Sequence, residues 1–367
     1  MKRYRPTFVE VDLDAIRHNV RALKPKGAEL MAVLKADGYG HGDVAVARAA
    51  LEAGATWLGV ALVEEGIALR DAGLRARILV LSELPPGSER EALAADLTPT
   101  LYTREGLEAL AEAARGLDRP VRVHLKVDTG MHRVGLWPPE SAPDFAAEVR
   151  ARGLELEGMY THFACAEEDP AGTRKQLGWL LAVADRLRAE GVRPLLHAAN
   201  SAATLLYPET HLDLVRTGAA MYGLDPGGGI GPRAGLQPAL TWRSAVSMVK
   251  RLPAGERLSY GWRYTLERDA TIATVPVGYE DGYSRLLSSK AEVLIGGRRR
   301  RVAGTVTMDQ IVVDCGDDEV GVGDPVVLVG EQGGERITAE ELAGIVGTIG
   351  YEIVTAISER VPREYRG

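Results

Sequence analysis

The chain has 367 residues, of which 46% are hydrophobic and 26% charged, so it can form two folded cores of ordinary globular composition. Its formal net charge of −7 gives no electrostatic reason to expect binding to nucleic acid or to an anionic membrane. No apolar segment approaches the ~20 residues that a membrane span needs. The two cysteines, Cys165 and Cys315, lie far apart, so we expect no metal site and predict reduced thiols in a cytoplasmic protein.

From residue 7 to about residue 220, short β-branched runs alternate with longer segments of helical period. The predicted strands are Thr7–Val11, Glu29–Leu34, Trp57–Ala61, Arg77–Leu81, Thr98–Tyr102, Val121–Val127, Leu156–His162, Pro194–Ala198 and Leu212–Arg216. Helices are predicted at Gly42–Ala53, Arg104–Ala114 and Arg174–Ala189. Strand, helix and strand at this spacing indicate right-handed crossovers and a parallel sheet. About eight such units in succession favour a (β/α)8 barrel over an open sheet.

A stretch rich in glycine and proline, residues 226–238, interrupts this pattern as a linker does. The strands predicted beyond it are Ala239–Arg251, Ala270–Pro276, Ala291–Ile295, Val302–Thr307, Gln310–Asp314 and Pro325–Val329, and one helix is predicted at Ala339–Val346. We interpret the basic run Arg298–Arg301 as the solvated flank of a hairpin. The sequence therefore predicts an α/β protein with a (β/α)8 barrel over residues 1–235 and a mostly β domain over residues 236–367.

One lysine lies directly after a predicted buried strand. Lys35 follows the apolar run Leu30–Leu34 and precedes a glycine-rich turn. In a barrel, the carboxyl ends of the strands form the face that carries the active site. Desolvation or a nearby cation can lower the pKa of such a lysine and free its amine for Schiff-base chemistry. An ordinary solvated lysine could have the same local sequence. The residues that follow the other predicted strands must therefore show whether Lys35 belongs to an active site.

Polar residues follow several of the other predicted strands at the same rim. They include Tyr39, Lys126, Asp128, Arg133, His162, His197, Asn200, Ser201 and Arg216. Ser201 precedes a short helix, and Arg216–Ala219 is a small-residue turn where barrels often bind phosphate, although capping and a tight turn would explain each alone. A strand-end lysine, a phosphate-binding turn and several hydrogen-bonding groups on one rim point to pyridoxal phosphate.

Motifs along the whole chain resemble those of the alanine racemases, which are pyridoxal-phosphate enzymes of fold type III. They are Ala32–Gly42, Lys126–Gly135, Tyr160–Ala164, His197–Thr204, Val215–Gly223, Ser259–Gly261, Pro276–Gly282, Met308–Gln310 and Gly350–Glu352. The resemblance implies a barrel followed by a β domain, which agrees with the strand pattern. It also implies that the chain interconverts L-alanine and D-alanine and supplies D-alanine for peptidoglycan.

The resemblance assigns a role to each matching residue. Lys35 would carry the cofactor and act as one base, and Tyr260 would be the base on the opposite face. His162 and Arg216 would help Tyr260 to lose its proton, and Arg216 would donate a hydrogen bond to the pyridine nitrogen. The remaining residues implied to bind the cofactor, mainly its phosphate, are Tyr39, Asn200, Ser201, Gly218, Ala219 and Tyr351.

Two further residues are implied to bind the substrate, namely Arg133 through its side chain and Met308 through its backbone N–H. Lys126 matches a lysine that is carbamylated in many family members, where the resulting anion holds the neighbouring arginine. The alternative is an unmodified Lys126 paired with an acid such as Asp128. A bare cation beside Arg133 would be unfavourable, which favours carbamylation.

The resemblance also implies a homodimer in which each site uses both chains, because Lys35 and Tyr260 belong to different domains. Tyr279 and Arg285 match residues that line the substrate entryway. Thr305 departs from the pattern, because some members carry an entryway arginine there, so the charge of the channel stays open.

Three other functions share part of this pattern. A racemase that also accepts serine is hard to exclude, because one methyl group gives only ~1–3 kcal/mol of discrimination. A barrel-type decarboxylase of basic amino acids typically pairs the ring nitrogen with a carboxylate, which Arg216 argues against. A non-catalytic carrier of pyridoxal phosphate has no need of a second base such as Tyr260.

Overall fold

The computed structural model describes residues 4–367, which form two compact units. The barrel unit consists of residues 15–38 and 43–237. The second unit contains residues 238–367 together with the chain up to Asp14 and the short segment Tyr39–Gly42. The junction therefore falls just after the predicted glycine- and proline-rich linker.

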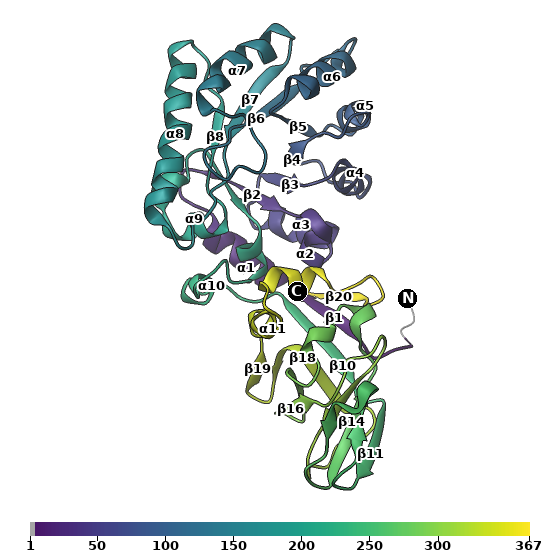
Figure 1. Cartoon of the computed structure of the whole chain (residues 1–367). Coiled ribbons are helices and arrows are strands. Elements are labelled where there is room, and N and C mark those ends of the chain that lie inside the picture. The colour runs from purple at the N-terminus through teal and green to yellow at the C-terminus, as the bar shows by residue number, and fades with distance from the viewer. Residues whose placement is uncertain (1–3) are drawn as a thin grey trace. The chain divides into compact units, whose positions relative to one another are not determined.

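The barrel unit is built on an eight-stranded sheet of parallel strands in the order β8-β7-β6-β5-β4-β3-β2-β9 (Figure 1). Its strands are β2 (Glu29–Val33), β3 (Trp57–Val60), β4 (Arg77–Glu83), β5 (Thr98–Leu101), β6 (Arg122–Lys126), β7 (Glu155–Tyr160), β8 (Leu195–His197) and β9 (Leu214–Thr217). The two edge strands are joined by hydrogen bonds from Asp213 N to Leu196 O and from Arg216 N to Ala199 O, both 3.0 Å long. The sheet is thus a nearly closed barrel, which confirms the predicted fold class.

Helices connect the strands and lie outside the sheet (Figure 1). They are α1 (Leu13–Leu23), α2 (Lys35–Gly40), α3 (Asp43–Glu52), α4 (Val63–Asp71), α5 (Glu89–Ala94), α6 (Arg104–Ala114), α7 (Ala142–Ala151), α8 (Pro170–Ala189), α9 (Ser201–Leu206) and α10 (Ile230–Arg233). Helix α8 begins four residues before its predicted start. Asp169 caps it by accepting a hydrogen bond from Gly172 N, and Pro170 occupies the first helical position, where no N–H is needed.

The second unit is mostly β, as predicted. Its main sheet has the order β11-β14-β17-β16-β15-β18-β10-β1-β20, with β19 paired to β18. The elements are β1 (Phe8–Asp12), β10 (Leu240–Ala245), β11 (Met248–Leu252), β14 (Ala270–Val275), β15 (Glu292–Ile295), β16 (Arg298–Val302), β17 (Ile311–Asp314), β18 (Pro325–Gln332), β19 (Glu335–Ile337) and β20 (Arg363–Arg366), the hairpin β12 (Arg257–Leu258) with β13 (Tyr264–Thr265), and the helices α11 (Ala339–Val346) and α12 (Gly350–Thr355).

The first predicted strand exists but does not belong to the barrel. β1 pairs antiparallel with β10 and parallel with β20 in the sheet of the second unit. Its burial alternates, with Val9 and Val11 fully buried and Glu10 between them half-buried, as in a strand that covers a core with one face. The barrel strand β3 is buried at every residue. This alternation is the sequence signal that separates β1 from the barrel strands.

The predicted strand Val302–Thr307 is wrong, because the strand lies earlier in the chain. β16 covers Arg298–Val302 and pairs with β15 across the turn at Gly296–Gly297. The arginine run is thus one strand of the hairpin, with Arg298 and Arg301 exposed, and part of its charge is paired with nearby carboxylates. The carboxylates that form ion pairs with Arg299 are those of Glu292, Glu335 and Glu341, at 3.1, 3.2 and 2.6 Å.

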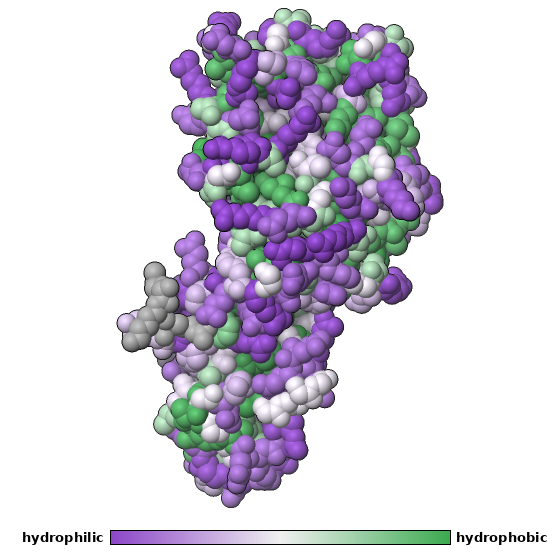
Figure 2. Space-filling view, turned by 180° about the vertical axis from the view of Figure 1, so that it is seen from behind, coloured by the Kyte–Doolittle hydropathy of each residue, from purple (hydrophilic) through white to green (hydrophobic). Residues whose placement is uncertain are grey.

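Charged and polar side chains cover most of the molecular face shown in Figure 2, and hydrophobic residues lie between them in small groups. This distribution fits a chain in which 26% of the residues are charged. Among residues 4–367, no helix is both long and apolar enough to cross a lipid bilayer.

One buried carboxylate ties together distant parts of the second unit. Asp281 is fully buried, and it accepts hydrogen bonds from both terminal nitrogens of Arg5 at 3.0 and 2.6 Å. It also accepts a hydrogen bond from Gly278 N at 3.0 Å. A bidentate pair of this kind joins the start of the described chain to the loop after β14.

We predict that Asp281→Asn lowers the free energy of unfolding by about 3 kcal/mol, because it removes the charge partner of Arg5 inside the unit. Urea denaturation measures the change. Asp317→Asn is the matched control, since Asp317 pairs with Arg251 on the surface at 2.6 Å and its loss should leave the midpoint almost unchanged. Equal midpoints for the two variants would contradict the assigned importance of Asp281.

Candidate functional site

Lys35 begins a left-handed helical turn and not the simple loop that the sequence suggested. Ala36, Asp37, Gly38 and Tyr39 have φ angles between 51° and 58°. Gly38 N donates to Leu34 O at 2.6 Å, which closes the turn. Left-handed backbone costs roughly 1–2 kcal/mol for each residue other than glycine, so surrounding contacts must hold this turn in place.

One of those contacts comes from Glu65, a residue that the sequence analysis missed. Its Oε1 accepts a hydrogen bond from Ala36 N at 2.7 Å, and its Oε2 accepts from Ala61 N and Leu62 N at 2.8 and 3.0 Å. Glu65 therefore joins the turn after β2 to the start of α4. Its signal in the sequence is the third position of a helix, where glutamate often bonds back to the preceding backbone.

The amine of Lys35 is made less basic by its surroundings. Burial is the main cause that lowers its pKa, and the positive charge of Arg133 lowers it further, while Glu65 opposes both. Lys35 is half-buried at the end of β2. A lysine that loses its proton more easily has more of its amine in the neutral form, which is the form that acts as a nucleophile or takes up a proton.

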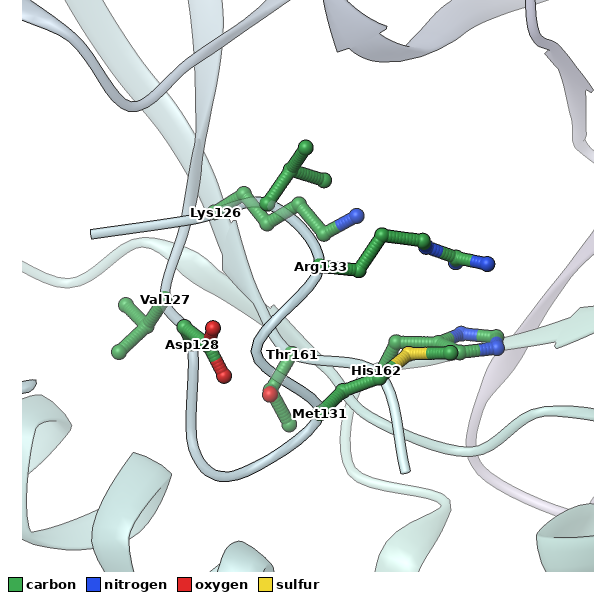
Figure 3. Close-up of a pocket in the computed structure, with 8 residues that line it drawn as sticks. Lys126, Val127, Asp128, Met131, Arg133, Thr161 and His162 are labelled. Atoms are coloured by element: carbon green, nitrogen blue, oxygen red, sulfur yellow. The ribbon is translucent and has the colours of Figure 1, made fainter. Parts of the chain in front are cut away.

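The barrel brings together several of the residues named from the sequence. A pocket beside β6 and β7 is lined by Lys126, Val127, Asp128, Met131, Arg133, Val134, Thr161 and His162. In Figure 3, the side chains of Lys126, Arg133 and His162 extend toward the same side of the view, and Asp128 lies on the other side of the loop. The three basic groups thus lie together in this view, while the Asp128 carboxylate lies 3.5 Å from His132 Nδ1 and its charge still raises the pKa of Lys126.

Lys126 is buried, with 6% of its surface exposed, and burial lowers its pKa to about 8, with further lowering by Arg216 and Arg133. No ion pair joins it to Asp128 in the part of the chain that the structure describes. Asp128 instead accepts hydrogen bonds from Gly130 N at 2.9 Å and from His132 N at 3.1 Å. The alternative of a Lys126–Asp128 pair is thus not what the structure shows.

Arg216 lies at the end of β9 with only 4% of its surface exposed. Its Nη1 donates to His197 Nδ1 at 3.0 Å, and its Nη2 contacts Thr161 O at 2.7 Å, Ala198 O at 3.0 Å and His162 Nδ1 at 3.3 Å. Burial lowers the pKa of Arg216 to about 10, so it stays charged at neutral pH. Its Nε–H and the second N–H of Nη1 have no partner within residues 4–367, so donors remain for a ligand.

His162 is neutral in this setting. Burial lowers its pKa well below the ordinary value, and the positive charges of Arg216, Lys126, Arg133 and Lys35 lower it further. Its Nδ1 faces Arg216, which can only donate, so the proton of the neutral ring lies on Nε2. The ring thus presents an N–H donor away from Arg216.

The predicted phosphate-binding turn is formed by two segments that Ser201 links. Its Oγ accepts hydrogen bonds from Gly218 N at 3.1 Å and from Ala220 N at 3.3 Å. Asn200 caps α9 by accepting from the N–H of the third helical residue at 3.0 Å. Within the described chain, the N–H groups of Ser201 and Ala219 have no acceptor, so both can bind an anion.

Two tyrosines named from the sequence lie together in the second unit. The rings of Tyr39 and Tyr351 meet edge to face, with centroids 6.3 Å apart and planes at 76°. Burial raises the pKa of Tyr39 to about 12, so its hydroxyl keeps its proton and remains a hydrogen-bond donor at neutral pH.

Tyr260 lies in a short turn of the second unit, and 73% of its surface is exposed. Thr305 holds this turn in place through two hydrogen bonds. Its Oγ1 donates to Tyr260 O at 2.8 Å, and its carbonyl accepts from Ser259 Oγ at 2.7 Å. Thr305 is itself buried, with 4% of its surface exposed, so it supports the Tyr260 turn and does not line an open channel.

Met308, Tyr279 and Arg285 are exposed residues of the second unit. Half of the Met308 surface is accessible, its carbonyl accepts from Glu280 N at 3.1 Å, and its N–H has no acceptor in the described chain. Tyr279 is 39% exposed, and its N–H donates to Thr307 O at 3.0 Å. Arg285 begins a separate short turn, Arg285–Leu287. The roles predicted for these three residues stay predictions.

We predict that Thr305→Val, which keeps the shape of the side chain but removes its hydroxyl, destabilises the Tyr260 turn. The lost hydrogen bond should lower the free energy of unfolding by about 1 kcal/mol. Amide exchange over residues 258–262 should become faster, while exchange in the distant strand β20 stays unchanged. Unchanged exchange in the turn would show that Thr305 does not hold it.

Comparisons with known proteins agree with this arrangement. Residues 11–226 match the family model of the alanine racemase N-terminal domain, and residues 239–365 match that of the C-terminal domain. The alanine racemase of Symbiobacterium thermophilum is 54% identical over 99% of this chain and 98% of its own length, and that of Frankia casuarinae is 48% identical over 97% and 95%.

Solved structures give the same result. The chain superposes on alanine racemase from the D-cycloserine producer Streptomyces lavendulae with a TM-score of 0.94, at 43% identity, over 100% of this chain and 98% of that one. The Bacillus anthracis alanine racemase with bound L-Ala-P also gives 0.94, at 41% identity, over 100% and 96%. On these findings, the chain belongs to the alanine racemase family.

Proposed function

We propose that this chain interconverts L-alanine and D-alanine with pyridoxal phosphate as its cofactor, and that Lys35 and Tyr260 are the two bases. Membership of the alanine racemase family supports the reaction and the cofactor. The single observation that carries the mechanism is the buried Arg216, whose terminal nitrogens are held by two carbonyls and two histidines while its Nε–H keeps no partner in the described residues. We further propose that the product serves peptidoglycan synthesis.

The residues of the barrel rim fit pyridoxal phosphate. The free N–H groups of Ser201 and Ala219, in the turn that Ser201 links to Gly218, suit a phosphate, and family membership supports Tyr39 and Tyr351 of the second unit as further phosphate-binding residues. Asn200 would act indirectly, since its side chain caps the helix that begins at Ser201. When bound, the cofactor supplies an electron sink that acidifies the α-proton of an amino acid.

Lys35 and Tyr260 would move the α-proton on opposite faces of the substrate. Burial and the charge of Arg133 lower the pKa of Lys35, which makes the neutral amine, the form that can take up the α-proton, easier to reach. Tyr260 would pass its phenolic proton from the other face. His162, with its N–H directed away from Arg216, would assist Tyr260 by hydrogen bonding.

Arg216 would donate its free Nε–H to the pyridine nitrogen. Because a guanidinium does not give up its proton at neutral pH, it offers a hydrogen bond without transferring charge. Such a partner limits electron withdrawal and thereby favours proton return over side reactions. A carboxylate, which would accept a proton from the ring, is the partner expected for the decarboxylase alternative.

Arg133 would bind the carboxylate of the amino acid, together with the free N–H of Met308. Its side chain is exposed and has no carboxylate partner within the described residues. We propose that Lys126 carries a carbamate, which would neutralise Arg133 and orient it. In that reaction the neutral amine adds to CO2 and releases one proton, and the lowered pKa of about 8 makes the neutral amine available.

The two bases belong to different units, which supports a homodimer in which Tyr260 of one chain completes the site around Lys35 of its partner. The exposed surfaces of Tyr260, Trp262 and Met308, at 73, 62 and 50%, are apolar area that a partner chain would cover. Tyr279 and Arg285 would then line the substrate entryway. An active monomer would contradict this assembly.

A cytoplasmic location stays a prediction. Both cysteines, Cys165 and Cys315, are free thiols, which is compatible with a reducing compartment.

We predict that the protein, loaded with pyridoxal phosphate and given L-alanine in D2O, produces D-alanine with deuterium at the α-carbon and releases no CO2. Proton NMR followed by chiral chromatography measures both. Loss of CO2 from lysine or ornithine would support the decarboxylase alternative, and no exchange with any amino acid would support a carrier. Serine, tested in the same way, measures how strictly the site selects alanine.

We predict that Tyr260→Phe lowers racemisation by about 10²–10⁴-fold, the usual contribution of a general base. One enantiomer of alanine should still exchange its α-proton through Lys35, with its configuration retained. The matched control is Tyr264→Phe, which removes a nearby phenol that bonds to Asp314 and should leave racemisation nearly unchanged. Equal losses in the two variants would remove Tyr260 from the mechanism.

We predict that ¹³C-labelled bicarbonate gives a carbamate carbon signal that is absent in Lys126→Ala. The signal should grow as pH rises through about 8, because only the unprotonated amine reacts with CO2. The surface variant Lys175→Ala serves as the control and should retain the signal. A spectrum without a carbamate carbon across this pH range would show that Lys126 is unmodified.

A further inference from the structure

Two fully buried histidines lie behind Arg216 in the barrel interior. His124 of β6 and His197 of β8 are both 0% exposed, and His124 Nδ1 lies 2.9 Å from His197 Nε2. Their rings meet at 67° with centroids 5.0 Å apart. His197 Nδ1 contacts Arg216 Nη1 at 3.0 Å, so the three side chains form one hydrogen-bonded chain.

The donors and acceptors of these three side chains fix which ring nitrogens carry protons. Arg216 has only donors, so His197 must accept at Nδ1 and carry its proton on Nε2. That N–H then points at His124 Nδ1, which must also accept, and the proton of His124 is placed on its Nε2. Burial lowers the pKa of both histidines, so each is neutral and has a single ring proton.

The hydrogen-bonded series of side chains ends at His124, whose buried Nε2 has no hydrogen-bond partner in the described residues, and the carboxylate of Glu157 lies just beyond hydrogen-bond distance from it. His124 Nε2 lies 3.6 Å from Glu157 Oε2, and Glu157 forms an ion pair with Arg77 at 3.2 Å. Glu157 has 11% of its side chain exposed and Arg77 has 52%, so the far end of the chain reaches solvent. An ionised carboxylate attracts an N–H group electrostatically and repels a ring lone pair, so Glu157 at 3.6 Å favours the Nε2–H form of His124.

The barrel wall makes room for this pair of rings. A Cβ atom on Gly158 would lie 2.5 Å from both Cε1 and Nδ1 of His124, so only glycine leaves space for the imidazole. The register between β6 and β7 also shifts at His124. On the other side, Tyr160 stacks on His197 with centroids 4.5 Å apart. If these positions served only to pack the core, aliphatic side chains, which need no polar partner, would be expected there in place of histidines.

We propose that His124 and Glu157 are positioning residues for Arg216. They hold His197 in the Nε2–H tautomer, and His197 Nδ1 therefore remains an acceptor that orients the guanidinium at the barrel rim. This proposal rests on the proposed function in one respect, namely that Arg216 meets the pyridine ring. The tautomers of His124 and His197 follow from the protein's own contacts and do not depend on the proposed function.

Neutron diffraction from a crystal of the cofactor-loaded protein grown in D2O tests the tautomers directly. The expected result is a deuteron on Nε2 of both His124 and His197 and none on either Nδ1. A deuteron on Nδ1 of either ring, or on both nitrogens, would overturn the proposal. This outcome does not depend on activity, so a protein that fails to racemise alanine would disprove the proposed function and leave this measurement valid.

Two substitutions of His124 separate hydrogen bonding from packing. His124→Asn keeps an acceptor near the position of Nδ1 but loses ring volume, and His124→Phe keeps the ring volume but removes the acceptor. We expect His124→Phe to lower kcat about tenfold with KM little changed and to shift the absorption band of the bound cofactor. His124→Asn should retain more activity and the original band.

The reverse order, with His124→Phe more active than His124→Asn, would show that His124 only packs. Trp57→Phe is the control for core damage, because Trp57 packs against the edge of His124 at 5.2 Å and bonds to Glu29 instead. It should leave the cofactor band in place. Glu157→Gln, at the solvent-facing end, should change kcat in the direction of His124→Phe but less, and an unchanged kcat would remove Glu157 from the chain.

Discussion

Repulsion among cations at the barrel rim is the constraint on which the site depends. Lys35, Lys126, Arg133 and Arg216 lie near enough to shift one another or the neighbouring His162. Their charges cannot be screened well in a partly buried setting. Burial first, and this repulsion in addition, lower the pKa of both lysines and of His162, and they make the rim favour anions, which a phosphate, a substrate carboxylate and a carbamate would supply.

The same constraint explains why so much of the surrounding structure serves to hold single groups in place. Arg216 is fixed by carbonyls and by neutral imidazoles that can accept from it. The left-handed turn after Lys35 is held by Glu65 through Ala36 N, and the Tyr260 turn is held by Thr305. Strained or exposed backbone at a site is retained where neighbours determine it, and these contacts are those neighbours.

Much of this protein was readable from the sequence alone. Local periodicity predicts each of the eight barrel strands to within a few residues, because strands buried on both faces form continuous apolar runs. The motif around Lys35 predicts a strand-end lysine, and the turn Arg216–Ala219 predicts an anion site. Each of these features depends on a short segment of sequence, so it can be predicted without knowledge of the fold.

Only the tertiary structure decided which partners these segments meet. The alternating pattern of Phe8–Asp12 predicts a strand with one buried face, and only its pairing with β10 and β20 shows which strands it meets in the second unit. Arg298–Val302 is a strand through its pairing with β15 and β17, and Glu292, Glu335 and Glu341 from other elements pair with Arg299 within it. The His124–His197 chain joins β6, β8 and β9. Contacts between residues distant in sequence depend on three-dimensional packing, so local pattern cannot contain them.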